Sequence, residues 1–103
     1  MRIEHYSTQK LNKEVSDIIG RYLDLSKYKI FFFGSRVSGK GNDRSDIDIG
    51  IEGPLPISSE VKSNIEDEIE NLSTLYKIEI VDFKHVSSEF RSVALQNIEL
   101  INP

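Results

Sequence analysis

The sequence predicts a domain of the α+β class, and three observations carry this prediction. Apolar residues recur at helical spacing in three separate segments of the chain. Between these segments lie short apolar or strictly alternating runs, which are typical of strands. The 103 residues contain no internal repeat, no low-complexity tract and no linker-like stretch, so we expect one domain over residues 1–103.

The first helix and the first strand are expected before residue 34. The helix is marked by apolar residues that recur every three or four positions, namely Leu11, Val15, Ile18, Ile19 and Tyr22. Ser7 or Thr8 precedes them and can cap the helix. Residues 28–33 form a β-rich apolar run that ends at Gly34 and Ser35, which predicts a buried strand.

The later elements are predicted from the same two patterns, the helical spacing of apolar residues and the alternation typical of strands. In residues 46–52, Asp46, Asp48 and Gly50 alternate with three isoleucines, which predicts a strand with unlike faces. A second long helix is marked by Val61, Ile65, Ile69, Leu72 and Leu75. Residues 77–83 form a third predicted strand, and Ser87 can cap a last short helix that is followed by an apolar tail.

Composition excludes several classes of function. Seventeen acidic residues against thirteen basic ones give a net charge of −4, so attraction to phosphate over the whole surface cannot drive nucleic-acid binding. The absence of cysteine removes disulfides and thiolate metal ligands, and two histidines are too few for a histidine-rich zinc site. No apolar run approaches the length of a membrane span, and residues 1–20 lack the apolar core of a signal peptide, so we expect a cytoplasmic protein.

The segment after the first predicted strand contains one incomplete phosphate-binding pattern. Residues 34–40 satisfy most of G-x-x-x-x-G-K-[ST], in which Lys40 would contact the terminal phosphates. The pattern fails at Gly41, where a serine or threonine hydroxyl should hold Mg²⁺. Three predicted strands are also few for the parallel sheet of such NTPases, so we favour a different arrangement.

In the favoured arrangement, phosphates bind at Gly34 and Ser35, and metal ions bind at two aspartates. The backbone amides and the serine hydroxyl can hold a triphosphate at the start of a short helix. Asp46 and Asp48 are two positions apart on a strand, so both carboxylates project from one face with Cα atoms about 6.5 Å apart. Such a pair can share two Mg²⁺ ions, which bind phosphates and activate an attacking oxygen.

Asp82 is the candidate for a third carboxylate. It ends the third predicted strand, and if that strand pairs beside residues 46–52, its carboxylate is expected about 5 Å from the aspartate pair. Glu79 is then expected on the opposite face, together with Val81.

This combination resembles the nucleotidyltransferases of the DNA polymerase β superfamily, and most closely their minimal stand-alone branch, the MNT domains. The residues that match are Gly34, Ser35, Arg36, Gly39, Ser45, Asp46, Asp48 and Asp82. The resemblance implies an α+β nucleotidyltransferase fold, in which a short mixed sheet packs helices on one face and presents the metal site on the other. It further implies a site in which Gly34, Ser35, Arg36 and Ser45 bind the nucleotide and Asp46, Asp48 and Asp82 are catalytic and hold two Mg²⁺ ions.

The resemblance also implies a function and a partner. In the MNT family, AMP is transferred from ATP to a tyrosine of a helical HEPN-domain toxin, for which the MNT protein is the antitoxin. We therefore expect ATP and a HEPN-type protein as partners in a hetero-oligomer, and neither a membrane nor strong nucleic-acid binding. Two alternatives stay open, which are a non-catalytic module that neutralises its partner by binding and an enzyme that modifies a small-molecule hydroxyl such as that of an antibiotic.

Each candidate residue also has a purely structural interpretation. Asp46 and Asp48 can be the charged residues of a solvated turn or of an edge strand. Asp82 can be an ordinary residue at a strand end, Ser35 can be a turn residue, and Arg36 can lie on the surface.

Overall fold

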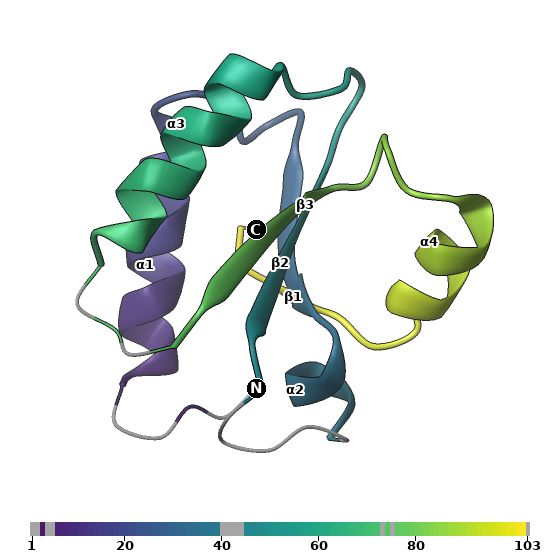
Figure 1. Cartoon of the computed structure of the whole chain (residues 1–103), viewed down its shortest axis with the longest axis horizontal. Helices are drawn as coiled ribbons and strands as arrows, with labels where there is room; N and C mark the ends of the chain where they lie inside the picture. The colour runs from purple at the N-terminus through teal and green to yellow at the C-terminus, as the bar shows by residue number, and fades with distance from the viewer. Residues whose placement is uncertain (1–2, 4–5, 40–44, 73, 75, 103) are drawn as a thin grey trace.

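A four-stranded mixed sheet organises the fold (Figure 1). The computed structural model describes residues 3, 6–39, 45–72, 74 and 76–102. The strands are β1 (Lys29–Phe33), β2 (Ile47–Glu52), β3 (Ile78–Asp82) and β4 (Glu99–Leu100), and their order in the sheet is β3-β2-β1-β4. β1 is antiparallel to β2 and β4, whereas β2 and β3 are parallel. The predicted α+β class is confirmed.

Two long helices cover one face of the sheet. α1 (Thr8–Gly20) is capped by the Ser7 side chain, and α3 (Ser59–Glu70) is capped by that of Ser58. Both lie on the same side of the sheet in Figure 1. Each serine side chain accepts a hydrogen bond from a backbone N–H of the first turn, a group that has no partner inside its helix.

The core between these helices and the sheet is largely aliphatic. The alternation expected in β2 is confirmed, because Ile47, Ile49 and Ile51 are fully buried on this face. They pack with buried residues of α1, α3 and the neighbouring strands, which are Leu11, Val15, Ile18, Ile19, Ile30, Phe32, Ile65, Ile69 and Ile80. A tyrosine and an arginine at the end of α1, Tyr22 and Arg21, also contact Glu68 of α3.

The opposite face carries a small aromatic core under α4 (Ser88–Ala94), which Ser87 caps. Phe31, Phe33 and Phe83 are buried there and meet edge to face, with ring centroids 4.9 Å apart for Phe31–Phe83 and 5.2 Å apart for Phe33–Phe83. The resemblance implied that the helices pack on one face of the sheet. The structure differs in one helix, because α4 covers part of the second face (Figure 1). Phe31 and Phe33 of β1 and Phe83, which follows β3, supply the apolar surface that α4 covers.

The apolar tail of the chain adds a fourth strand that the sequence does not predict. β4 pairs with β1, and two residues are too few to show an alternating pattern. Asn102 holds the tail in place, because its Oδ1 accepts from the Ile30 N–H at 2.7 Å and its Nδ2 donates to the Tyr28 carbonyl at 2.8 Å. The second long helix ends earlier than expected. Leu72 lies beyond α3, and Leu75 lies outside the described residues.

No helix in the part of the chain that the structure describes has the length and apolar character required to cross a bilayer.

Candidate active site

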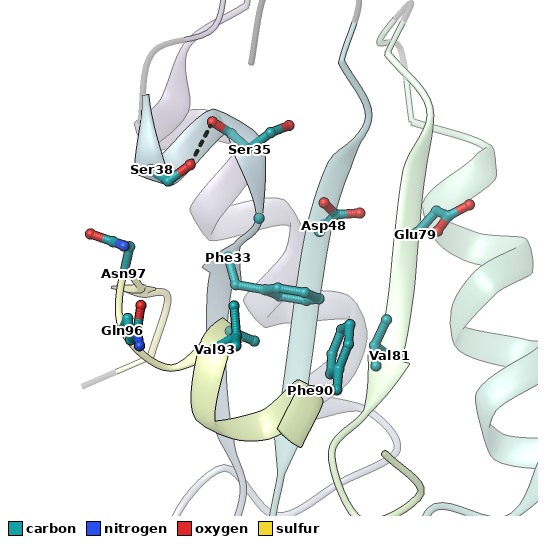
Figure 2. Close-up of a pocket in the computed structure, with 12 residues that line it drawn as sticks. Phe33, Ser35, Ser38, Asp48, Glu79, Val81, Phe90, Val93, Gln96 and Asn97 are labelled. Carbon is teal, nitrogen blue, oxygen red and sulfur yellow. Dashed lines mark hydrogen bonds between the residues drawn. The ribbon is translucent and has the colours of Figure 1, made fainter. Parts of the chain in front are cut away.

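The strand register brings Asp48 and Glu79 side by side. Asp48 on β2 pairs with Phe33 on β1 and with Glu79 on β3. Residues that pair directly across a ladder share a face of the sheet, so both carboxylates belong to the face that α4 partly covers. Figure 2 shows the two side chains on neighbouring strands at the upper end of one pocket. Glu79 also lies 3.3 Å from the ammonium of Lys77, measured from Oε1 to Nζ.

Gly34 lets the turn after β1 approach Asp48 closely. Its φ of 87° and ψ of −164° lie in a region that is almost restricted to glycine. A Cβ added there would stand 2.2 Å from Oδ2 of Asp48, so a larger residue would displace the carboxylate. The turn leads directly into α2 (Ser35–Ser38), whose Ser35 and Ser38 also line the pocket.

The pocket has a volume of about 600 Å³ and joins three parts of the chain. Ser35 and Ser38 form its upper rim in Figure 2, and Asp48 and Glu79 lie beside them on the sheet. Gly34 also lines the pocket. The remaining lining is mostly apolar and comes from the sheet, from α4 and from the turn after it, namely Phe33, Val81, Phe90, Val93, Ala94, Gln96 and Asn97. The Gly34–Ser35 turn, two acids and an apolar half thus share one cavity.

Burial and the repulsion of neighbouring acids both raise the pKa of Asp48. Burial is the largest cause, and the negative charges of Glu79 and Asp46 add to it, so that the pKa rises from 3.8 to about 6. A divalent cation between these oxygens would remove the repulsion, and carboxylates are the ligands that Mg²⁺ prefers. Among the described residues, no three acidic or histidine side chains already stand close enough together to form a complete metal cage. The donor set fits a hard cation that keeps water and substrate oxygens as further ligands.

Asp82 does not join the pair, and its expected position is wrong. The parallel register places it opposite Ile51, three positions along the ladder from Asp48 and Glu79. Its side chain belongs to the buried face and is only 5% exposed. The carboxylate accepts hydrogen bonds from the Ile57 N–H at 2.8 Å and the Lys84 N–H at 2.9 Å. The error arises because a shift of an odd number of residues along a strand moves the side chain to the other face.

Glu79 is the acid that the sequence analysis missed. The sequence analysis placed Asp82 on the same face as Asp46 and Asp48. Glu79 is three positions from Asp82 on the same strand, so it was expected on the opposite face. One signal could have found it, because Ile78, Glu79 and Ile80 repeat the isoleucine–acid–isoleucine pattern of Ile47, Asp48 and Ile49. Aligning the two patterns gives the observed register.

Arg36 and Ser45 contact each other and are not among the residues that line the pocket. Arg36 Nε donates to the Ser45 carbonyl at 2.7 Å, and its guanidinium lies over the ring of Tyr76, 4.6 Å from the ring centroid. These contacts tie α2 to the residues that precede β2 and β3. Asp46 directly precedes β2, and its negative charge contributes to the raised pKa of Asp48. Lys40 and Gly41 lie outside the described residues.

Comparisons with known proteins identify the family of this chain. The family model described as polymerase beta, nucleotidyltransferase matches residues 25–102. The probable protein adenylyltransferase MntA of Haemophilus influenzae is 26% identical over 66 residues, which are 64% of this chain and 58% of that protein. The chain therefore spans less than two thirds of the length of this curated relative.

Solved structures share the fold at low sequence identity. A crystal structure of a toxin–antitoxin with AMP-PNP superposes with a TM-score of 0.69 at 15% identity, covering 87% of this chain and 71% of that one. A complex of tri-AMPylated Shewanella oneidensis HEPN toxin with an MNT antitoxin gives a TM-score of 0.66 at 16% identity, covering 91% and 71%. With a family model that spans three quarters of its length, the chain belongs to the polymerase beta nucleotidyltransferase family.

Proposed function

We propose that this protein is a Mg²⁺-dependent nucleotidyltransferase that transfers AMP from ATP to a hydroxyl group, with a tyrosine of a HEPN-type partner as the acceptor. One observation carries the proposal, namely the pairing of Asp48 with Glu79 in the same pocket as the Gly34–Ser35 turn. Such an arrangement combines a site for phosphates with a site for the cations that accompany them.

Asp46 and Asp48 would hold the metal ions, and Glu79 takes the place that the sequence analysis gave to Asp82. When bound, Mg²⁺ would neutralise charge on the phosphates and lower the pKa of the attacking hydroxyl. The chain itself supplies the negative charge that attracts the ions, since Glu79 and Asp46 both lie close enough to Asp48 to add to the effect of burial on its pKa. Asp82 instead stabilises the fold through its two backbone partners.

The nucleotide phosphates would lie at Gly34 and Ser35. Gly34 has no side chain that could separate the turn from Asp48, so phosphates at the turn can reach ions held by the acids. Arg36 and Ser45 would act as positioning residues, since their contact fixes α2 relative to the residues that lead into β2. Holding the reacting groups in place in this way lowers the entropic cost of the transfer.

The relatives support the choice of nucleotide, acceptor and partner. MntA carries the name of a protein adenylyltransferase, and one toxin–antitoxin structure contains AMP-PNP, an analogue of ATP. Another structure pairs an MNT antitoxin with a tri-AMPylated HEPN toxin. On this basis we extend adenylylation of a HEPN partner, and the role of antitoxin, to the present chain.

The test is transfer of label from ATP labelled at the α-phosphate, in lysate of the source cells with Mg²⁺. We expect one labelled protein band with the wild type and none with the Asp46→Asn/Asp48→Asn variant. Asp67→Asn, which removes an exposed acid from α3, is the matched control and should label normally. Recovery of a stable partner without any label would contradict the proposal and favour a non-catalytic binding module, whereas label on a small molecule alone would contradict the protein acceptor.

A further inference from the structure

The pocket is larger than the acids and the phosphate turn require. Beyond Asp48 and Glu79 it continues along β3 and under α4, where Val81 and Phe90 line it. Phe90 packs on Phe33 and Phe83, with ring centroids 6.1 Å and 5.9 Å away, yet 44% of its surface stays exposed. Figure 2 shows Phe90 and Val81 facing one another below the two acids. A half-exposed ring at the mouth of an apolar cavity is suited to contact a bound ligand.

The order of the strands indicates whether the apolar half of the pocket would bind the nucleotide or the acceptor. α2 follows β1 on one side of Asp48, and β3 lies on the other side. In phosphoryl and nucleotidyl transfer, the attacking and leaving oxygens are roughly in line with the phosphorus between them. If the leaving pyrophosphate lies at Gly34 and Ser35 and the α-phosphate near Asp48, the attacking oxygen enters from the β3 side. In this arrangement the acceptor would lie over Glu79 and Val81, which line the pocket on β3.

The length of this half matches one kind of acceptor. Glu79 and Val81 share a face and are two positions apart, which is about 7 Å along the strand and comparable to the length of a tyrosine side chain. A phenol whose hydroxyl lies beside Glu79 can place its ring against Val81 and Phe90. A serine or threonine hydroxyl in the same position leaves both apolar side chains without a contact.

We propose that Val81 and Phe90 form a subsite for the ring of the acceptor and make the enzyme selective for phenolic over aliphatic hydroxyls. This inference rests on the proposed function. In the step itself, the phenolic oxygen forms a bond to the α-phosphorus of ATP, and the bond from that phosphorus to the bridging oxygen breaks. Pyrophosphate leaves with the electron pair, the phenolic proton passes to solvent, and the product is an aryl ester of AMP.

A binding experiment tests the subsite without catalysis. Methyl resonances of Val81 and Val93 are followed by NMR while N-acetyl-tyrosinamide is added, with N-acetyl-serinamide, N-acetyl-leucinamide and adenosine as separate ligands. We expect saturable shifts at Val81 with the tyrosine compound and about tenfold weaker binding of the serine and leucine compounds. The buried Val15 on the other face should not shift. Equal binding of leucine, or displacement of the tyrosine compound by adenosine, would overturn the subsite.

Variants of Phe90 distinguish the contribution of its aromatic ring to binding from that of its apolar surface area. Phe90→Ala and Phe90→Leu should each weaken binding of the tyrosine compound, by about tenfold for Phe90→Ala. Leu100→Ala, which removes a side chain of similar exposure from β4 outside this pocket, should bind as the wild type does. A thermal melt shows whether each variant is folded. If Phe90→Ala does not fold, Phe90→Leu still tests the subsite.

The transfer assay then distinguishes the two proposals. We expect Phe90→Leu to raise the KM for a tyrosine acceptor peptide by several fold while kcat changes little. Transfer that is insensitive to Phe90 would overturn the subsite and leave the proposed function intact. Binding of the phenol without any transfer would support the subsite and contradict the proposed function.

Discussion

The two faces of the sheet are built from different residues and are closed to different extents. Under α1 and α3 the sheet is lined with fully buried isoleucines, and the carboxylate of Asp82 is hydrogen-bonded to backbone amides. Under α4 the sheet carries an aromatic cluster at one end and two acids, Asp48 and Glu79, at the other. The first face thus provides most of the stability, and the second tolerates mutual repulsion between acids because it is open to ligands.

Removing a large side chain from each face should give the greatest difference in stability. Ile49→Ala deletes a fully buried side chain and should lower the free energy of unfolding by about 3 kcal/mol. Phe90→Ala removes a half-exposed ring and should cost about 1 kcal/mol. Urea unfolding measures both values, and equal losses would contradict the view that the α4 face contributes little.

Adding a methyl group at Gly34 should cost nearly as much as a core cavity. Gly34→Ala forces a side chain into a backbone region reserved for glycine and toward Asp48, so we expect a loss of about 2 kcal/mol and no detectable transfer. Gly39→Ala is the matched control. Its φ is also positive at 82°, but its Cβ would meet open space, so about 1 kcal/mol should be lost and transfer retained. Active Gly34→Ala protein would show that the close approach to Asp48 is unimportant.

The acid on the closed face should act on stability alone. Asp82→Asn replaces one acceptor oxygen by an NH₂ group that faces a backbone donor, and this should cost about 1–2 kcal/mol. Differential scanning calorimetry measures the loss, while transfer per folded molecule should stay at the wild-type level. If transfer disappears in a folded Asp82→Asn protein, the assignment of Glu79 as the third acid is wrong.

Asp48, the acid on the open face, should lower the free energy of unfolding, and this effect should depend on pH. The pKa of Asp48 is raised from 3.8 to about 6, so the folded state binds its proton more tightly than the unfolded state does. The contribution of Asp48 to wild-type stability should therefore fall as pH rises from about 4 to about 6. Asp48→Asn removes this fall and should be more stable at pH 8 by about 1 kcal/mol, a value reduced for screening by solvent.

Magnesium provides the check on this pH effect. Saturating Mg²⁺ should raise the melting temperature of the wild type at pH 8, because a ligand that binds only the folded state stabilises it. Asp48→Asn should respond much less. An equal response of both proteins, followed by thermal melts, would place the cation elsewhere.

The smallest effect is expected at the ion pair that joins α4 to the sheet. Arg91 Nε lies 2.6 Å from Oε2 of Glu52, and the Arg91 side chain is half exposed, so Arg91→Ala should cost about 0.5 kcal/mol. The matched variant on the closed face is Lys62→Ala, which breaks the exposed Lys62–Glu66 pair within α3. Hydrogen exchange should accelerate in α4 for Arg91→Ala and remain unchanged there for Lys62→Ala. Identical exchange in α4 would mean that the pair does not hold this helix.

Local features of the fold could be predicted from the sequence, and relations between distant segments could not. Serine caps and the alternation of β2 depend on neighbouring residues, and both are confirmed. The register of β2 against β3 depends on the long connection through α3, and the expectation for Asp82 failed at that point. β4 escaped detection because its two residues pair only through a distant partner strand and are locked there by Asn102. Gly34, Ser35 and Asp48 lie in one pocket because β1 and β2 are adjacent antiparallel strands, a short-range relation that the sequence indicates; their role in binding stays a prediction.

The most direct test of the account compares two conservative changes at the two acids of β3. Glu79→Gln and Asp82→Asn are assayed for Mg²⁺-dependent transfer of α-labelled AMP to the acceptor identified in the lysate, at a temperature where both proteins are folded. The account predicts that Glu79→Gln loses transfer by at least about 100-fold with a melting temperature that is not lowered. It also predicts that Asp82→Asn keeps transfer with a lowered melting temperature. The reverse pattern, with transfer lost in Asp82→Asn and kept in Glu79→Gln, would contradict the account.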